Sequence, residues 1–370
     1  MAVPESNGTK HDLFGDIAVA KSMLTWAQVR DVLKKQLKYR QKGIQIRVGE
    51  LAIEMGFLTA AQINDIIVEQ RHLRQTDEVR HSAPKADLHD WEDSSVQQPY
   101  ILGPFQLQKR LGGVMGIVFK ATDTRTGQTV AVKILPKNLA QDPTFVERFK
   151  REVLAASSLS HPNIISVWDS GVINKVFYLA MEYVDGETLI RRMHREKIVP
   201  EREALTIGLG VTRALEHAHA QGVLHRDVKP ENIMISSTGQ VKLADLGLAL
   251  FLNDTLRITS EGIAVGTPHY ISPEEARALR QTDQRSDLYS LGATLFHVVS
   301  GRLPYEGENG SEVMKRHVFE ATPNPQDVNP AISNDTAGMI VKLMAKDPKQ
   351  RYQSATELAA VLEYLLTQVK

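Results

Sequence analysis

The stretch that decides the fold covers residues 223–235 and reads V-L-H-R-D-V-K-P-E-N-I-M-I. Within six residues it places an aspartate, a lysine and an asparagine, which are Asp227, Lys229 and Asn232. A further aspartate, Asp245, opens the tripeptide D-L-G thirteen residues after Asn232. Polar residues at this spacing seldom occur together by chance, so this motif guides the interpretation of weaker sequence patterns elsewhere in the chain.

The composition limits the class of protein. The 370 residues suffice for about two or three domains and a sizeable core. Lys plus Arg equals Asp plus Glu, at 44 each, which argues against nucleic acid or an anionic membrane as the main partner. The absence of cysteine excludes disulfides, cysteine zinc sites and thiol catalysis. We find no signal peptide and no apolar run long enough to span a membrane, so we expect a cytoplasmic protein.

An internal repeat occupies the N-terminal part of the chain. The segment G-D-I-A-V-A-K-S-M-L-T-W-A-Q-V-R-D-V-L-K-K-Q begins at Gly15, and G-E-L-A-I-E-M-G-F-L-T-A-A-Q-I-N-D-I-I-V-E-Q begins at Gly49, an offset of 34 residues without a gap. We place the copies at about 12–36 and 46–70 and expect each to fold as a helix, a turn and a second helix. One copy has too little core to stand alone, so the two should pack together in a helical module covering residues 1–75.

The turns of the repeat carry helix-capping signals. Thr25 and Thr59 are each followed three residues later by a glutamine, Gln28 and Gln62, which is the pattern of a capping box. Gly56 stands where a left-handed helix end favours glycine, and the first copy has serine there.

The pattern changes twice after the repeat. Residues 76–99 are polar and charged without apolar periodicity, so we expect a flexible linker. From residue 100 the segments F-Q-L-Q-K-R-L, G-I-V-F-K-A and Q-T-V-A-V-K-I-L indicate strands, and helical patterns follow. An antiparallel sheet followed by a helical region predicts an α+β fold.

On the motifs H-R-D-x-K-P-x-x-N and D-L-G, residues 100–366 resemble a bacterial, eukaryotic-type Ser/Thr protein kinase. The resemblance implies a β-rich N-lobe over residues 100–184 and a helical C-lobe over residues 185–366. It also implies ATP and Mg²⁺ as cofactors and proteins with serine or threonine acceptors as substrates.

The resemblance assigns the catalytic roles. Asp227 would orient the substrate hydroxyl and accept its proton, and Asn232 and Asp245 would hold two magnesium ions. Lys229 would meet the γ-phosphate and marks the serine/threonine class. Phosphoryl transfer depends mainly on positioning and charge neutralisation, which is why charged groups at fixed spacing are needed.

Other implied roles concern the nucleotide. Lys133 would bind the α- and β-phosphates and pair with Glu152. Six residues would surround the adenine: Val118 and Ala131 on one face, Met234 on the other, Met181 at the back, and the backbone of Glu182 and Val184 at the edge.

The glycine loop departs from the family pattern. Residues 110–121 read R-L-G-G-V-M-G-I-V-F-K-A, one residue short of the usual L-G-x-G-x-x-G-x-V. Either the tip is one residue shorter or Leu111 occupies the first glycine position, and Gly113 and Gly116 are kept in both registers. The residues Leu111, Gly112, Gly113 and Gly116 would still cover the phosphates, with weaker ATP binding. The alternative hypothesis is a pseudokinase, or a nucleotide-binding scaffold that transfers no phosphate.

The resemblance also implies how the C-lobe is braced and controlled. Glu274 would pair with Arg351, Asp287 would brace the backbone of the catalytic loop, and Thr267 would contact that loop. Arg226 lies directly before Asp227, and kinases that this chain resembles usually offset such a cation with a phosphate on the activation segment, which lies between Asp245 and Glu274. The candidate sites are Thr255, Thr259 and Ser260, which a second molecule in a homodimer would phosphorylate.

The N-terminal repeat resembles the small helical N-terminal domains of type II secretion and pilus ATPases. Some relatives bind cyclic di-GMP through an R-L-G motif in each copy. Here the second copy has Arg47, but the first has Leu13 at the matching position. We therefore expect a protein-interaction or dimerisation module rather than a nucleotide sensor.

Overall fold

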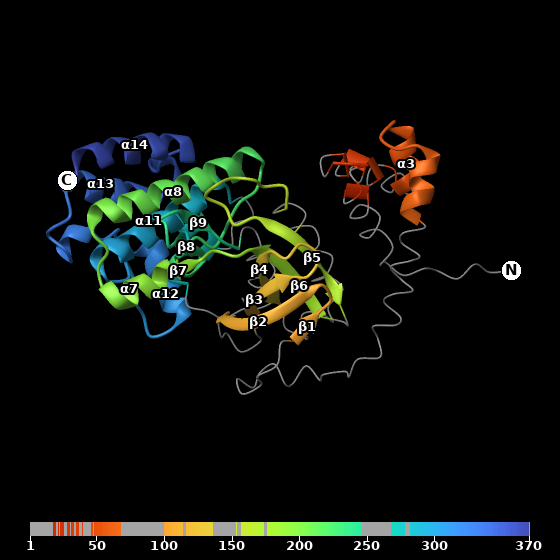
Figure 1. Cartoon of the computed structure of the whole chain (residues 1–370). Coiled ribbons are helices and arrows are strands. Elements are labelled where there is room, and N and C mark those ends of the chain that lie inside the picture. The colour runs from red at the N-terminus through yellow and green to blue at the C-terminus, as the bar shows by residue number, and fades with distance from the viewer. Residues whose placement is uncertain are drawn as a thin grey trace. The chain divides into compact units, whose positions relative to one another are not determined.

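The computed structural model of the chain describes residues 48–67, 100–113, 116–135, 157–173, 176–245, 268–277 and 282–369, together with Val153 and single positions between 18 and 46. The chain forms two compact units, residues 1–97 and 98–370. In the N-terminal unit, helix α3 (Val48–Glu54) is the first helix described in full (Figure 1).

The two copies of the repeat make the same backbone hydrogen bonds. The amides of Met23 and Leu24 donate to Ala18 O at 2.8 and 3.1 Å, and those of Phe57 and Leu58 donate to Ala52 O at 2.9 and 3.2 Å. These donors and acceptors are related by the 34-residue offset of the sequence repeat. Buried residues of both copies, among them Val29, Val32, Leu51 and Ile66, belong to one hydrophobic cluster, so the copies pack together as expected.

The predicted caps of the repeat are confirmed. Thr25 N–H donates to Gln28 Oε1 at 2.8 Å, while Gln28 N–H donates to Thr25 Oγ1 at 3.3 Å. Thr59 and Gln62 make the same reciprocal pair at 2.9 and 3.3 Å. Gly56 has a φ of 70°, the left-handed conformation expected at that helix end.

The second unit begins with an antiparallel sheet of six strands in the order β1-β2-β3-β4-β6-β5 (Figure 1). The strands are β1 (Tyr100–Leu102), β2 (Phe105–Gly112), β3 (Ile117–Asp123), β4 (Thr129–Ile134), β5 (Val167–Ile173) and β6 (Val176–Glu182). The sheet is curled, because its two edges meet. A Cβ added to Gly103, in the turn after β1, would lie only 2.4 Å from Ile173 Cδ1 on β5.

A small three-stranded sheet opens the helical lobe. Its strands β7 (Gly186–Thr188), β8 (Ile233–Ser236) and β9 (Val241–Leu243) pair in that order. The short 3₁₀ helix η2 (Pro230–Asn232) runs directly into β8, the central strand, so the segment with Lys229 and Asn232 is anchored at the start of that strand.

The helices of this lobe surround α11 (Gln284–Ser300). Fourteen of its seventeen residues are buried, as expected for a central helix that is apolar on most sides. The others are α7 (Leu189–Glu196), α8 (Glu201–Ala220), α10 (Pro273–Ala276), α12 (Gly310–Phe319), α13 (Asn334–Leu343) and α14 (Ala355–Gln368). Side chains of Asp283, Asn309, Ser333 and Ser354 cap α11, α12, α13 and α14 in turn. The expected two-lobed α+β fold is confirmed. Within the described part of the chain, no helix has the length and apolarity of a membrane span.

Candidate active site

Lys133 and Asp245 bring the two lobes together. Lys133 lies on β4 and is 6% exposed, and its Nζ is 2.8 Å from Asp245 Oδ2. Burial raises the pKa of Asp245, but the Lys133 ammonium outweighs this effect, so the pKa lies below its ordinary value and the carboxylate is ionised. Asp245 also has a φ of 56°, a strained conformation for a residue with a Cβ. Glu152, the predicted partner of Lys133, lies outside the described residues.

In the loop predicted to be catalytic, Lys229 and Asn232 both contact Asp227. Lys229 Nζ is 2.6 Å from Asp227 Oδ2, and Asn232 Nδ2 donates to the same oxygen at 2.9 Å. Asn232 Nδ2 also donates to Asp227 O at 2.8 Å. Because the amide nitrogen makes both bonds, Asn232 Oδ1 has no partner among the described residues and can serve as a metal ligand.

A buried carboxylate on α11 braces this loop, as predicted. Asp287 Oδ1 accepts from Arg226 N–H at 2.7 Å, and Oδ2 accepts from His225 N–H at 2.9 Å. His219, which the sequence analysis did not single out, adds a third donor through Nε2 at 2.7 Å. Burial raises the pKa of Asp287, but the His219 hydrogen bond and charge outweigh it and keep the pKa low. Arg226 has a φ of 64°, a strained conformation that these bonds maintain.

His225 has a structural role in the described part of the chain. Its Nδ1 accepts from Asp227 N–H at 3.1 Å, and its Nε2 lies 2.8 Å from Ala244 O. A neutral ring with the proton on Nε2 satisfies both bonds, so His225 links the loop of Asp227 to the segment that carries Asp245.

The predicted adenine-contacting residues of the N-lobe share one face of the large sheet. Val118 lies opposite Lys133, and Ala131 lies opposite Met181. Directly opposed residues of antiparallel strands project to the same face, and Ala131 and Lys133 are two residues apart on one strand. The register therefore brings these four side chains together. Nothing in the described part of the chain accepts a hydrogen bond from the Val184 amide, which leaves that donor available to a ligand.

The glycine loop has backbone conformations that require glycine. Gly112 ends β2 with a φ of 141°, and Gly113 and Gly116 have φ values of 126° and 141°. A Cβ on Gly116 would lie 2.6 Å from Ile134 O, on the neighbouring strand. Leu111 lies beside Gly112 on β2, and Gly112 pairs with Val118. The turn is therefore built for glycine although it is one residue short.

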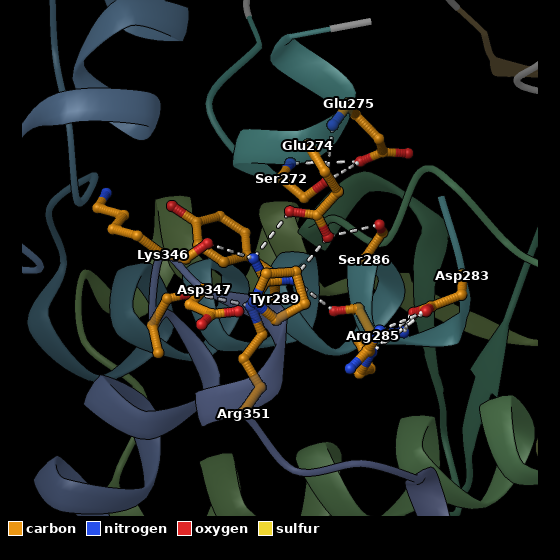
Figure 2. A network of polar contacts seen from close by, with 12 residues as sticks. Ser272, Glu274, Glu275, Asp283, Arg285, Ser286, Tyr289, Lys346, Asp347 and Arg351 are labelled. Carbon is orange, nitrogen blue, oxygen red and sulfur yellow. Dashed lines mark hydrogen bonds and ion pairs between the residues drawn. The ribbon is translucent and has the colours of Figure 1, made fainter. Parts of the chain in front are cut away.

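The predicted ion pair between Glu274 and Arg351 is confirmed (Figure 2). Arg351 Nη1 and Nη2 donate to Glu274 Oε1 and Oε2 at 2.7 and 2.8 Å. Ser272, two residues before Glu274, forms a capping box with Glu275 through its Oγ and backbone N–H at the start of α10. Thr267, Thr255, Thr259 and Ser260 lie outside the described residues.

Comparison with known proteins identifies the family. The model of the protein kinase domain family matches residues 105–362. The chain belongs to the protein kinase family. A probable serine/threonine-protein kinase of Streptomyces coelicolor is 42% identical over 279 residues, which cover 73% of this chain and 41% of that protein. The serine/threonine-protein kinase PrkC of Bacillus subtilis is 39% identical over 261 residues, covering 70% of this chain and 40% of that protein.

Solved kinase structures share the fold. The crystal structure of the C20A mutant of the PknI kinase domain of Mycobacterium tuberculosis has a TM-score of 0.59 at 27% identity, covering 73% of this chain and 98% of that chain. The chain spans about two-fifths of the length of the curated relatives it matches.

Proposed function

We propose that the chain transfers the γ-phosphate of ATP to serine or threonine hydroxyls of protein substrates. One observation carries this proposal: Lys229 and Asn232 both contact Asp227 within a single loop, at distances of 2.6 to 2.9 Å. The ionised pair of Lys133 and Asp245 adds the charges that a phosphate and a divalent cation require.

The side chains suit Mg²⁺, because Asn232 offers a free amide oxygen and Asp245 an ionised carboxylate. When bound, the metal neutralises charge on the phosphates. In the transfer, the substrate hydroxyl oxygen bonds to the γ-phosphorus as the bond from that phosphorus to the β–γ bridging oxygen breaks, and ADP leaves. Asp227 orients the hydroxyl and accepts its proton, while Lys229 and Lys133 hold the phosphate oxygens.

The Asp227→Asn variant tests the proposal. We expect kcat to fall by about two to four powers of ten while ATP still binds, because the change removes the proton acceptor but no phosphate contact. The measurement is transfer of labelled phosphate to a serine- and threonine-containing protein or peptide, with calorimetric binding of ATP and Mg²⁺. A wild-type chain that binds ATP but transfers no more label than this variant would support the pseudokinase alternative instead.

We propose further that phosphorylation of the activation segment raises activity. The Nε of Arg226 is buried without a hydrogen-bond partner among the described residues, directly beside Asp227. A buried guanidinium nitrogen without an acceptor favours an anion nearby. A triple alanine variant of Thr255, Thr259 and Ser260 should be less active, and mass spectrometry of the wild type should find phosphate there that is absent from Asp227→Asn. Full activity of the triple variant would contradict the proposal.

For the N-terminal repeat we propose a protein-interaction or dimerisation module. The duplicated turns and the shared core support a compact helical unit. Arg47 and Leu13, on which the cyclic di-GMP alternative depends, lie outside the described residues. Calorimetry with cyclic di-GMP and light scattering of the full chain distinguish the two: self-association without nucleotide binding supports the proposal, and binding of the nucleotide contradicts it.

A further inference from the structure

A second ion pair links the segment between the two lobes with β9, the strand that precedes Asp245. Glu182 is the last residue of β6, and Lys242 is the central residue of β9. Lys242 Nζ lies 2.8 Å from Glu182 Oε1 and 3.0 Å from Oε2, so the ammonium contacts both carboxylate oxygens. The two residues are 60 positions apart in the sequence.

The pair is largely shielded from water. Lys242 is only 9% exposed, and a buried ammonium needs a close anion and good hydrogen-bond geometry. The carboxylate is itself held in place, because Ser166 N–H donates to Glu182 Oε2 at 3.3 Å and Glu182 N–H donates to Ser166 O at 2.9 Å. Both the side chain and the backbone of Glu182 are therefore hydrogen-bonded to Ser166.

The backbone of β9 on both sides of Lys242 is held by hydrogen bonds to residues 163–165. The amide of Leu243 donates to Asn163 O at 2.8 Å, and Ile165 N–H donates to Leu243 O at 3.0 Å. The side chain of Asn163 also donates to Val241 O at 2.8 Å. With these bonds on both sides of Lys242, the ammonium is attached to a part of the C-lobe that has little freedom to move.

The position of Lys242 relates it to the nucleotide base. Lys242 lies directly opposite Met234 in the β8–β9 register, so both side chains project to the same face of the small sheet. Met234 is the C-lobe residue proposed to contact adenine. On the other side of the ion pair, Val184 follows Glu182 by two residues and has the amide without a partner in the described part of the chain.

We propose that Lys242 is a positioning residue for recognition of the nucleotide base. Through Glu182 it holds residues 182–184 in the backbone conformation that presents their hydrogen-bonding groups to adenine. The inference rests on the proposed function, because it assumes that the site binds ATP. An ion pair that only stabilises the fold would leave base selectivity unchanged. An ion pair that positions residues 182–184 orders them before ATP binds, so less binding free energy is spent on ordering them.

The test compares Lys242→Met with Lys242→Arg in the full chain, using KM and kcat for ATP and GTP and calorimetric Kd for both nucleotides with Mg²⁺. We expect Lys242→Met to raise KM and Kd for ATP about tenfold, to change kcat less than about threefold, and to lower the preference for ATP over GTP. Lys242→Arg keeps a cation for Glu182 and should stay close to wild type. Lys342→Met is the matched control, because it removes a lysine from an exposed pair in the C-lobe.

A double-mutant cycle with Glu182→Gln shows whether Lys242 affects ATP binding through its ion pair with Glu182 or independently of Glu182. If Lys242 acts only through its ion pair with Glu182, the double variant raises KM for ATP no more than the stronger single variant. Additive effects, or a Lys242→Met enzyme with unchanged ATP affinity and ATP preference, would overturn the inference. If the wild type binds ATP without transferring phosphate, the proposed transfer fails but the binding comparison still decides the role of Lys242. A wild type that binds neither nucleotide overturns both.

Discussion

Arg351 shows how one buried residue can organise a region of the kinase. It is 2% exposed, and its guanidinium has five N–H donors. Two donate to Glu274 and the other three hydrogen bonds go to the carbonyl oxygens of Ala345, Arg285 and Lys346 (Figure 2). The ring of Tyr289 lies 4.8 Å from the guanidinium carbon. The buried charge of Arg351 is tolerated because every N–H donor of its guanidinium has a hydrogen-bond acceptor.

The first prediction concerns this pair. Arg351→Met should lower the free energy of unfolding by about 3–5 kcal/mol, because it leaves the Glu274 carboxylate buried without its partner. Arg316→Met, which breaks an exposed pair with Glu312 on α12, should change it far less, because solvent screens that pair. Urea unfolding of both variants measures the difference. If Arg351→Met does not fold, Glu274→Gln provides the same test with a smaller change in shape. Equal changes in the free energy of unfolding for the buried and the exposed pair would contradict the prediction.

The second prediction is a pH dependence. Burial raises the pKa of Glu274, but its bonds to Arg351 outweigh this and hold the pKa below the ordinary value of 4.5. A depressed pKa in the folded state contributes stability above the unfolded pKa, and this contribution is lost as the pH falls through the folded value. Below about pH 4.5 the wild type should therefore lose stability more steeply than Glu274→Gln. Parallel curves of unfolding free energy against pH for the two proteins would be the opposite result.

At the scale of elements, the glycine loop is the feature that departs from the family pattern. Strands β2 and β3 stay paired up to Gly112 and Val118, with register shifts between Leu107 and Lys109 and between Arg110 and Gly112. The large positive φ values of Gly112, Gly113 and Gly116 show that the turn still uses conformations only glycine adopts easily. The neighbouring β4, with Lys133, keeps its register with β3.

The third prediction concerns this turn. Inserting one glycine between Gly112 and Gly113 restores the length of the family pattern without changing either strand. We expect a lower KM for ATP and little change in kcat, because the backbone amides of the tip approach the phosphates while Lys133 and Asp245 are untouched. Steady-state kinetics with varied ATP measure both constants. Gly338→Ala, on the exposed side of α13 where an added Cβ meets nothing within 4 Å, serves as the control. An unchanged KM would show that the tip does not limit ATP binding.

At the scale of the whole molecule, the chain consists of two compact units with separate hydrophobic cores. The core of the N-terminal unit comes from both copies of the repeat. The core of the kinase unit is centred on α11 and includes residues of α8, α13 and α14. Units with their own cores can fold separately.

The fourth prediction tests that independence. Residues 1–75 alone should give a helical circular dichroism spectrum and a cooperative thermal transition, because the repeat provides its own caps and core. Deletion of residues 1–95 should leave kcat and KM towards a small peptide within about twofold, while self-association or partner choice changes. Enzyme assays and light scattering measure the two effects. A deletion variant that no longer folds would mean that the kinase unit depends on the module.

The sequence by itself determined the features that depend on neighbouring residues. The capping boxes of Thr25 and Thr59, the left-handed Gly56 and the short glycine turn each involve groups within a few positions, so spacing alone predicts their geometry. The motif around Asp227 added the family and, through resemblance, the distant pair of Glu274 and Arg351. Only the tertiary structure decided that Lys133 meets Asp245 across 112 positions, that His219 supports Asp287, and that Lys242 is paired with Glu182. The physical reason is that a buried charge finds its partner through the packing of elements far apart in the chain, which local spacing does not encode.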